Sequence, residues 1–161
     1  MLEIIQGDLL DFPKDINVLA HSCNTRNVMG GGIARQIKER YPEAFDADSK
    51  AYFNSENKLG EFSFCKLRQD NNKRIINLYT QEDFGQGRQV DYESFFRSIT
   101  YLKEAIVCSK DAEKYVLGFP FGISCGLAGG SWNIIFSMLN EVFSGAVFTT
   151  LIVKKDHIYH A

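Results

Sequence analysis

A glycine-rich loop between an expected strand and an expected helix most constrains the fold of this chain. Residues 21–34 read HSCNTRNVMGGGIA, and they follow an apolar run, Ile16–Ala20, that is typical of a buried strand. Because glycine has no side chain, backbone N–H groups in Gly30–Gly32 can approach a ligand closely. The N-terminus of the following helix favours negative charge. The pattern therefore predicts an α/β fold with a phosphate-binding loop.

A second loop of the same kind occurs late in the chain. Tyr115–Phe119 is predicted as a buried strand, residues 120–130 read PFGISCGLAGG, and a helix is expected to begin at Ser131 or Trp132. In open α/β folds such loops meet at the carboxyl edge of the sheet, where ligands bind. We therefore expect both loops to hold a nucleotide-like diphosphate; the alternative is that their glycines only form tight turns.

The other periodic segments complete an alternating α/β pattern. Further strands are expected at Leu2–Gln6, Glu61–Leu67, Arg74–Tyr79 and Ala146–Val153. Helices are expected from Ile33 until Pro42 stops the first one, near Glu43–Phe53, from Tyr92 to Ile106 and from Trp132 to Phe143, with their aromatic stripes in the core. This order predicts a three-layer α/β/α sandwich with a mixed central sheet, as a single domain over residues 1–161.

Composition limits the partners and the compartment. The 161 residues carry a formal net charge of -2, and scattered Lys and Arg side chains give no footprint for long nucleic acid. The four cysteines show no paired metal spacing, which indicates free thiols, and neither a signal peptide nor a membrane-spanning run is evident. His157 and His160, around Asp156, are interpreted as a frayed tail. We expect a cytoplasmic protein without a metal or cofactor.

Three motifs, in order along the chain, resemble those of the macrodomain family, the ADP-ribose-binding modules. They are Gly7-Asp8 after the first strand, HSCN at 21–24 with GGGIA at 30–34, and the loop Gly122–Gly130. The resemblance covers almost the whole chain. It implies a three-layer α/β/α fold and a ligand that is ADP-ribose, its 1''-phosphate or an ADP-ribosylated macromolecule.

The resemblance also implies roles for individual residues. Asp8 would accept a hydrogen bond from the adenine amino group, although an N-cap or Asx turn is the alternative. Asn24 would hold the distal ribose, or could equally be a turn residue. Apolar side chains would wall the cleft. The implied ligand site consists of Asp8, Leu9, Asn24, Gly30, Gly31, Gly32, Ile33, Ala34, Gly122, Ile123, Ser124, Cys125, Gly126, Leu127 and Ala128.

The branch that the chain most resembles is the ADP-ribose 1''-phosphate phosphatases, on the first loop and on Arg40-Tyr41-Pro42. Branches that remove ADP-ribose from Asp or Glu side chains carry Asp where this chain has Ala34. Branches with a covalent lysine mechanism carry Lys where this chain has Gln81, and the protein-directed one carries Asp in place of Ala128. These departures argue against a covalent lysine mechanism.

Phosphate-ester hydrolysis needs a group that moves a proton. His21 is the best catalytic candidate, acting with Asn24, because it is expected at the exit of the second strand and titrates near neutral pH. A neutral histidine hydrogen-bonded beneath the loop is the alternative. Glu82 and Asp83 could activate water or be solvated loop charges. Cys125 is interpreted as a wall residue, because its loop has no Arg to bind a phosphoryl group.

The resemblance therefore implies a protein that binds ADP-ribose and hydrolyses ADP-ribose 1''-phosphate to ADP-ribose and phosphate. Neither glycine loop ends in the Gly-Lys-Ser/Thr of a P-loop, and neither has a clean dinucleotide fingerprint. Two alternatives stay open. The protein could read ADP-ribose without turnover, or it could remove ADP-ribose from protein or nucleic acid.

Overall fold

A six-stranded sheet forms the centre of the protein, with the spatial order β1-β6-β5-β2-β4-β3. The computed structural model describes residues 1–51, 55–83 and 89–155. Neighbouring strands are parallel except β3, which runs antiparallel to β4 at one edge. The predicted mixed sheet is therefore confirmed. The strands are β1 (Glu3–Gln6), β2 (Val18–Asn24), β3 (Phe62–Lys66), β4 (Arg74–Gln81), β5 (Val116–Pro120) and β6 (Thr149–Lys154).

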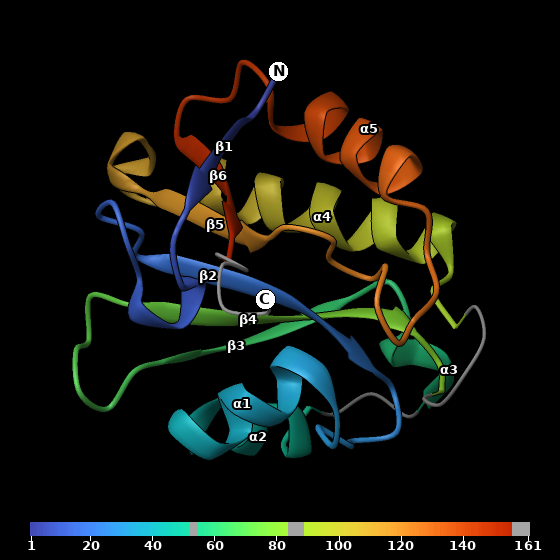
Figure 1. Ribbon diagram of the computed structural model, residues 1–161. Helices are drawn as coiled ribbons and strands as arrows, with labels where there is room; N and C mark the ends of the chain where they lie inside the picture. The colour runs from blue at the N-terminus through green and yellow to red at the C-terminus, as the bar shows by residue number, and fades with distance from the viewer. Residues whose placement is uncertain (52–54, 84–88, 156–161) are drawn as a thin grey trace, which may run out of the picture.

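Helices cover both faces of this sheet, which confirms the predicted three layers. Figure 1 shows α4 (Tyr92–Val107) and α5 (Trp132–Phe143) on one face, and α1 (Gly32–Arg40) and α2 (Pro42–Ser49) on the other. The short α3 (Ser55–Lys58) leads into β3, and the 3-10 turns η1 (Leu9–Asp11) and η2 (Ala112–Lys114) lie in connections. No helix in the described ranges has the length and apolar character needed to cross a membrane.

The apolar spacing of the helices explains the two faces. Phe95, Ile99 and Leu102 of α4 are buried against the sheet, as the sequence pattern predicted. Pro42 separates α1 from α2, since proline suits the first turn of a helix but not its interior. The short helix expected near Glu43–Phe53 is α2, which ends at Ser49; Phe53 lies outside the described residues.

The second strand extends further than predicted. The sequence suggested that it ends at Ala20, but β2 continues to Asn24, paired with β4 throughout. His21, Ser22 and Asn24 look like loop residues because they are polar. In the structure their backbones continue the ladder, and their side chains have hydrogen-bond partners on neighbouring segments.

An irregularity in the β2–β4 pairing marks the end of these strands. Cys23 pairs with Tyr79, but the next residue, Asn24, pairs with Gln81. Such bulges re-aim side chains and are common beside functional sites. The carboxyl ends of β2, β4 and β5 therefore open together at the edge where both glycine loops begin.

Candidate ligand-binding cleft

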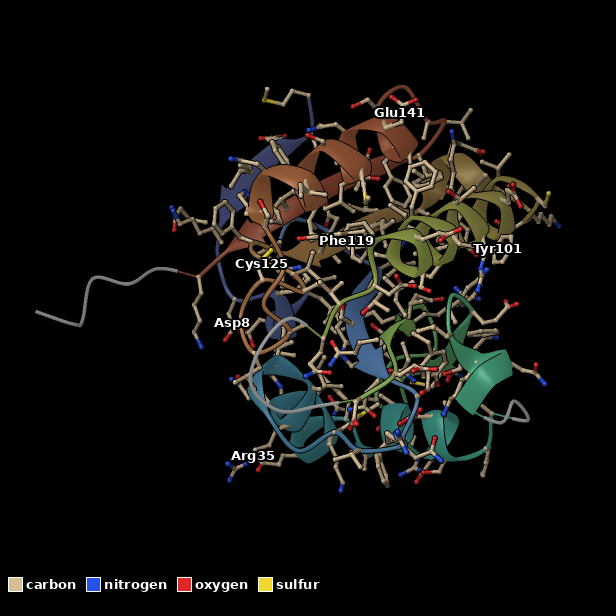
Figure 2. All side chains as sticks on the ribbon, turned by 90° about the vertical axis from the view of Figure 1, so that its right-hand side faces the viewer. Asp8, Arg35, Tyr101, Phe119, Cys125 and Glu141 are labelled. Carbon is tan, nitrogen blue, oxygen red and sulfur yellow. The ribbon has the colours of Figure 1, made fainter. Side chains whose placement is uncertain are left out.

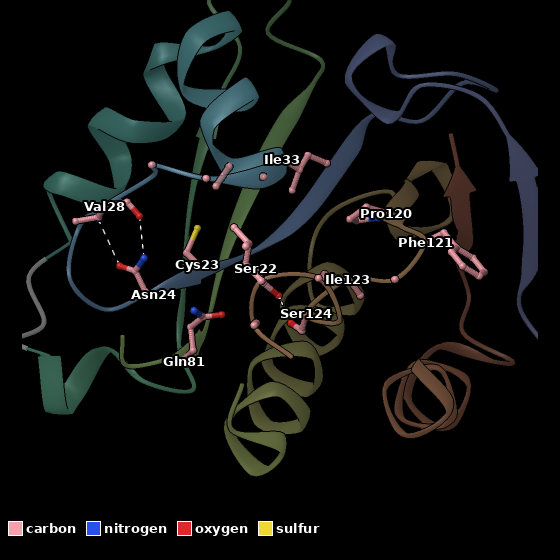
Figure 3. A pocket seen from close by; sticks show the side chains of 18 residues that line it. Ser22, Cys23, Asn24, Val28, Ile33, Gln81, Pro120, Phe121, Ile123 and Ser124 are labelled. Carbon is pink, nitrogen blue, oxygen red and sulfur yellow. Dashed lines mark hydrogen bonds between the residues drawn. The ribbon is translucent and has the colours of Figure 1, made fainter. Parts of the chain in front are cut away.

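A cleft of about 540 Å³ lies at the carboxyl edge of the sheet, between the two glycine loops. Figure 3 shows the loop before α1 on one side and the loop after β5 on the other. No charged side chain occurs among the described residues that line it. These residues are Ser22, Cys23, Asn24, Val28, Gly30, Gly31, Gly32, Ile33, Ala34, Gln81, Pro120, Phe121, Gly122, Ile123, Ser124, Gly126, Leu127 and Ala128.

The two loops approach each other directly. A Cβ atom added to Gly31 would lie 2.8 Å from Cδ1 of Leu127 in the second loop. Deeper in the cleft, the hydroxyl groups of Ser22 and Ser124 are 2.5 Å apart and hydrogen-bonded. The expected pairing of the glycine loops is therefore present, with Leu127 crossing over the first loop.

Backbone geometry fixes the second loop. Gly122 and Ser124 have φ values of +76° and +63°, in the left-handed region that favours glycine. Gly130 N–H donates to the Ser124 carbonyl at 2.8 Å, and a Cβ at Gly130 would lie 2.6 Å from that oxygen. Glycine at position 130 thus permits the tight return of the loop toward α5.

Asn24 organises the first loop with its own side chain. Its Oδ1 accepts from the backbone N–H of Arg26 at 2.9 Å and of Val28 at 3.4 Å. Its Nδ2 donates to the Val28 carbonyl at 2.8 Å, as the dashed lines in Figure 3 show. Asn24 is therefore a turn residue, one of the two interpretations considered for it, and it also lines the cleft.

Asp8 and Leu9 lie outside the main cleft, in a smaller adjoining hollow of about 200 Å³. This hollow shares Ile33 and Phe121 with the cleft, and Figure 2 shows Asp8 near α1. Asp8 Oδ1 accepts from Leu10 N–H at 3.0 Å and caps η1. This is the N-cap role that was considered as the alternative for Asp8. Its Oδ2 lies 3.7 Å from Nζ of Lys155.

His21 does not lie where the sequence suggested. It is in the middle region of β2, fully buried, and it does not line the cleft. Its Nε2 is 2.7 Å from Asn77 Oδ1. Asn77 Nδ2 donates to the Ala44 carbonyl and to Ser63 Oγ, so Oδ1 must accept and His21 carries its proton on Nε2. Burial lowers the pKa of His21 to about 4, which keeps the ring neutral at physiological pH.

The two cysteines near the cleft have the properties of packing residues. Cys125 is not among the lining residues; its thiol donates to the Ile123 carbonyl, and burial raises its pKa. The prediction that Cys125 contacts the ligand is therefore not supported by its position. Cys23 does line the cleft, but burial raises the pKa of its thiol well above the ordinary value. Neither thiol is an activated nucleophile.

Charged groups appear just beyond the strand ends instead. Arg26 and Asp83, which follow the ends of β2 and β4, have Nη2 and Oδ2 3.7 Å apart and are both about half exposed. Thr25 Oγ1 donates to the Glu82 carbonyl at 3.0 Å and ties these two strand ends together. Asp156, His157 and His160 lie outside the described residues.

The implied list of individual site residues left out several lining residues, most of which belong to the predicted loops at 21–34 and 120–130. Ser22, Cys23, Val28, Gln81, Pro120 and Phe121 line the cleft, and Gln36, Lys154 and Lys155 line the hollow. Pro120 and Phe121 follow a predicted strand directly, so their place at its carboxyl end could have revealed them. Gln81 was named only as the position where other branches carry Lys, and it is the last residue of β4.

Similarity to known proteins agrees with this geometry. Residues 20–138 match the family model of the Macro domain. The ADP-ribose 1''-phosphate phosphatase of Candida albicans is 30% identical over 148 residues, covering 88% of this chain and 93% of that protein. The DNA ADP-ribosyl glycohydrolase of Mycobacterium tuberculosis is 37% identical over 146 residues, covering 89% of this chain but 39% of that protein.

The fold is shared with a solved structure. The macrodomain of Mycobacterium tuberculosis DarG superimposes with a TM-score of 0.78 at 26% identity, over 98% of this chain and 99% of that one. The sheet order, the two glycine loops and the family match all lead to one assignment. This chain belongs to the macro domain family.

Proposed function

We propose that the protein binds ADP-ribose with its diphosphate between the two glycine loops. The single observation that carries this proposal is the direct opposition of Gly31 and Leu127 across the cleft. The lining residues offer backbone N–H groups and a helix N-terminus rather than charged side chains. Such a site suits an anion whose charge is spread along a diphosphate.

The adenine would occupy the hollow beside Asp8. Asp8 Oδ2 is not the atom that caps η1, and it can accept from an exocyclic amino group. Phe121 borders both the hollow and the cleft, and its ring offers an apolar surface between the base and the diphosphate. The distal ribose would then lie against Asn24 and Gln81, at the far end of the cleft.

The reaction we propose is hydrolysis of ADP-ribose 1''-phosphate at this distal end. Arg26 would bind the phosphoryl oxygens, and the Asp83 carboxylate would take a proton from an attacking water. The new bond forms between water oxygen and phosphorus. The bond between phosphorus and the anomeric oxygen breaks, that oxygen takes a proton from solvent and leaves as a hydroxyl group, and Asp83 returns its proton to solvent. The names of relatives such as the Candida albicans phosphatase support this substrate.

His21 has a different role in this proposal. Its neutral ring, hydrogen-bonded to Asn77 beneath the loop, positions the end of β2 and does not touch the substrate. Replacing it should therefore reduce activity in proportion to the loss of folded protein.

Phosphate release from ADP-ribose 1''-phosphate tests the reaction. Asp83→Asn should lower turnover by about a hundredfold or more, while the Kd for ADP-ribose changes little, because the glycine loops remain. Asp70→Asn is the matched control, since Asp70 is a partly exposed carboxylate in the turn before β4 that also pairs with a surface cation. Equal turnover by Asp83→Asn and wild type would refute the role of Asp83.

A second candidate is removal of ADP-ribose from DNA, favoured by the 37% identity to the mycobacterial glycohydrolase. Gln81 lines the cleft where the distal ribose would lie. Its side chain has no nucleophilic group, unlike the Lys that branches with a covalent lysine mechanism carry at this position. The same experiment, run with ADP-ribosylated DNA and ADP-ribosylated protein, separates these activities. Tight ADP-ribose binding without turnover of any of the three substrates would identify a reader.

A further inference from the structure

A buried ammonium group lies beneath the first glycine loop. Lys58, at the end of α3, is 1% exposed. Its Nζ donates to Asp48 Oδ1 at 2.8 Å, to the Asp48 carbonyl at 3.1 Å and to Asn27 Oδ1. Because an ammonium has three N–H donors, each of them has an acceptor here.

The sheet holds this ion pair rigidly. The Tyr79 hydroxyl, on buried β4, donates to Asp48 Oδ1 at 2.8 Å, and its ring lies 4.5 Å from Lys58 Nζ. Two residues beyond Lys58, Gly60 N–H donates to the Tyr79 carbonyl at 2.8 Å. Lys58 therefore has little freedom to move, and the direction of its third donor is fixed.

That third donor reaches the first glycine loop at its most exposed stretch. Asn27 lies between Arg26 and Val28, the two residues that Asn24 holds, and its φ of +60° is left-handed. Residues 26–28 are all exposed to solvent. The Asn27 amide is a second link between this stretch and the buried interior, besides the hydrogen bonds of Asn24 with Arg26 and Val28.

The geometry points to Lys58 as a positioning residue that holds residues 25–29 in the ligand-binding conformation through Asn27. This inference rests on the proposed function, because it concerns the affinity of the same cleft. A buried ion pair contributes little net stability compared with packed apolar side chains. Its consequence here is a preformed loop, so that Asn24 and Val28 need not be ordered when the ligand binds.

Variants of Asn27 test this without leaving Asp48 as an unpaired buried charge. Asn27→Gly removes the amide but keeps a residue that adopts φ of +60° easily. We expect its Kd for ADP-ribose to rise about tenfold, with a melting temperature close to that of wild type. Asn27→Asp restores an acceptor for Lys58 and should bind more tightly than Asn27→Gly. Asp15→Gly is the control, a left-handed exposed position (φ +65°) outside the cleft, and should bind like wild type.

Amide hydrogen exchange of the ligand-free variants separates this inference from the proposed function. Asn27→Gly should speed exchange of the Arg26 amide, which donates to Asn24, by about tenfold, and Asn27→Asp should not. Unchanged exchange and unchanged affinity in Asn27→Gly would overturn the role of Lys58. If wild type fails to bind ADP-ribose, the proposed function is wrong, and the exchange measurement still decides whether Lys58 orders the loop.

Discussion

Acidification should destabilise this protein through His21. The ordinary pKa of histidine is 6.5, and burial lowers the pKa of His21 to about 4 in the folded state. Between these two pH values the unfolded chain binds a proton that the folded protein excludes, so stability falls as pH falls. The difference of about 2.5 pKa units, at about 1.36 kcal/mol each, corresponds to about 3 kcal/mol.

Urea unfolding at pH 7, 6, 5 and 4 measures this contribution. The comparison is wild type against His21→Gln, whose amide can donate to Asn77 but does not titrate. The free energy of unfolding of wild type should fall by about 3 kcal/mol more than that of the variant between pH 7 and pH 4, with most of the difference below pH 6.5. Parallel pH dependences in the two proteins would refute the burial argument for His21.

Three substitutions test the loops and the hollow. Gly31→Glu should abolish ADP-ribose binding in calorimetry, because it puts a negative charge beside the diphosphate. Its melting temperature should be normal, because the added side chain displaces only the flexible tip of Leu127. Asp8→Asn keeps a cap for η1 and should weaken binding by about 1–3 kcal/mol, whereas an unchanged Kd would place the adenine elsewhere. Gly130→Ala should cost about 2 kcal/mol or more in urea unfolding, since its Cβ meets the Ser124 carbonyl; wild-type stability would contradict that contact.

The alternating periodicity was sufficient to predict the layers. Apolar spacing in segments such as Tyr92–Ile106 reports which face meets the sheet, and the structure confirms that face for α4. The glycine loops could also be predicted, because a backbone that approaches a ligand closely requires glycine, and glycines are read directly from the sequence. Both features depend on residues adjacent along the chain.

The contacts between buried polar side chains near the site could not be predicted in this way. His21 was expected to act on the ligand because it was predicted at the exit of the second strand, close in sequence to Asn24 and the glycines, whereas it lies within β2. In fact its partner, Asn77, is 56 residues away, and the buried ion pair of Lys58 with Asp48 also joins separate segments. Strand pairing and tertiary packing decide which buried polar residues form hydrogen bonds with each other. A single sequence carries no local pattern that reports these pairings.

Calorimetric titration of the wild-type protein with ADP-ribose and with AMP tests the central claim most directly. If the opposed loops bind a diphosphate and Asn24 contacts the distal ribose, ADP-ribose should bind at least about tenfold more tightly than AMP, which has one phosphate and no second ribose. Equal affinities for the two ligands would contradict the account, because the loops would then add nothing to adenosine recognition.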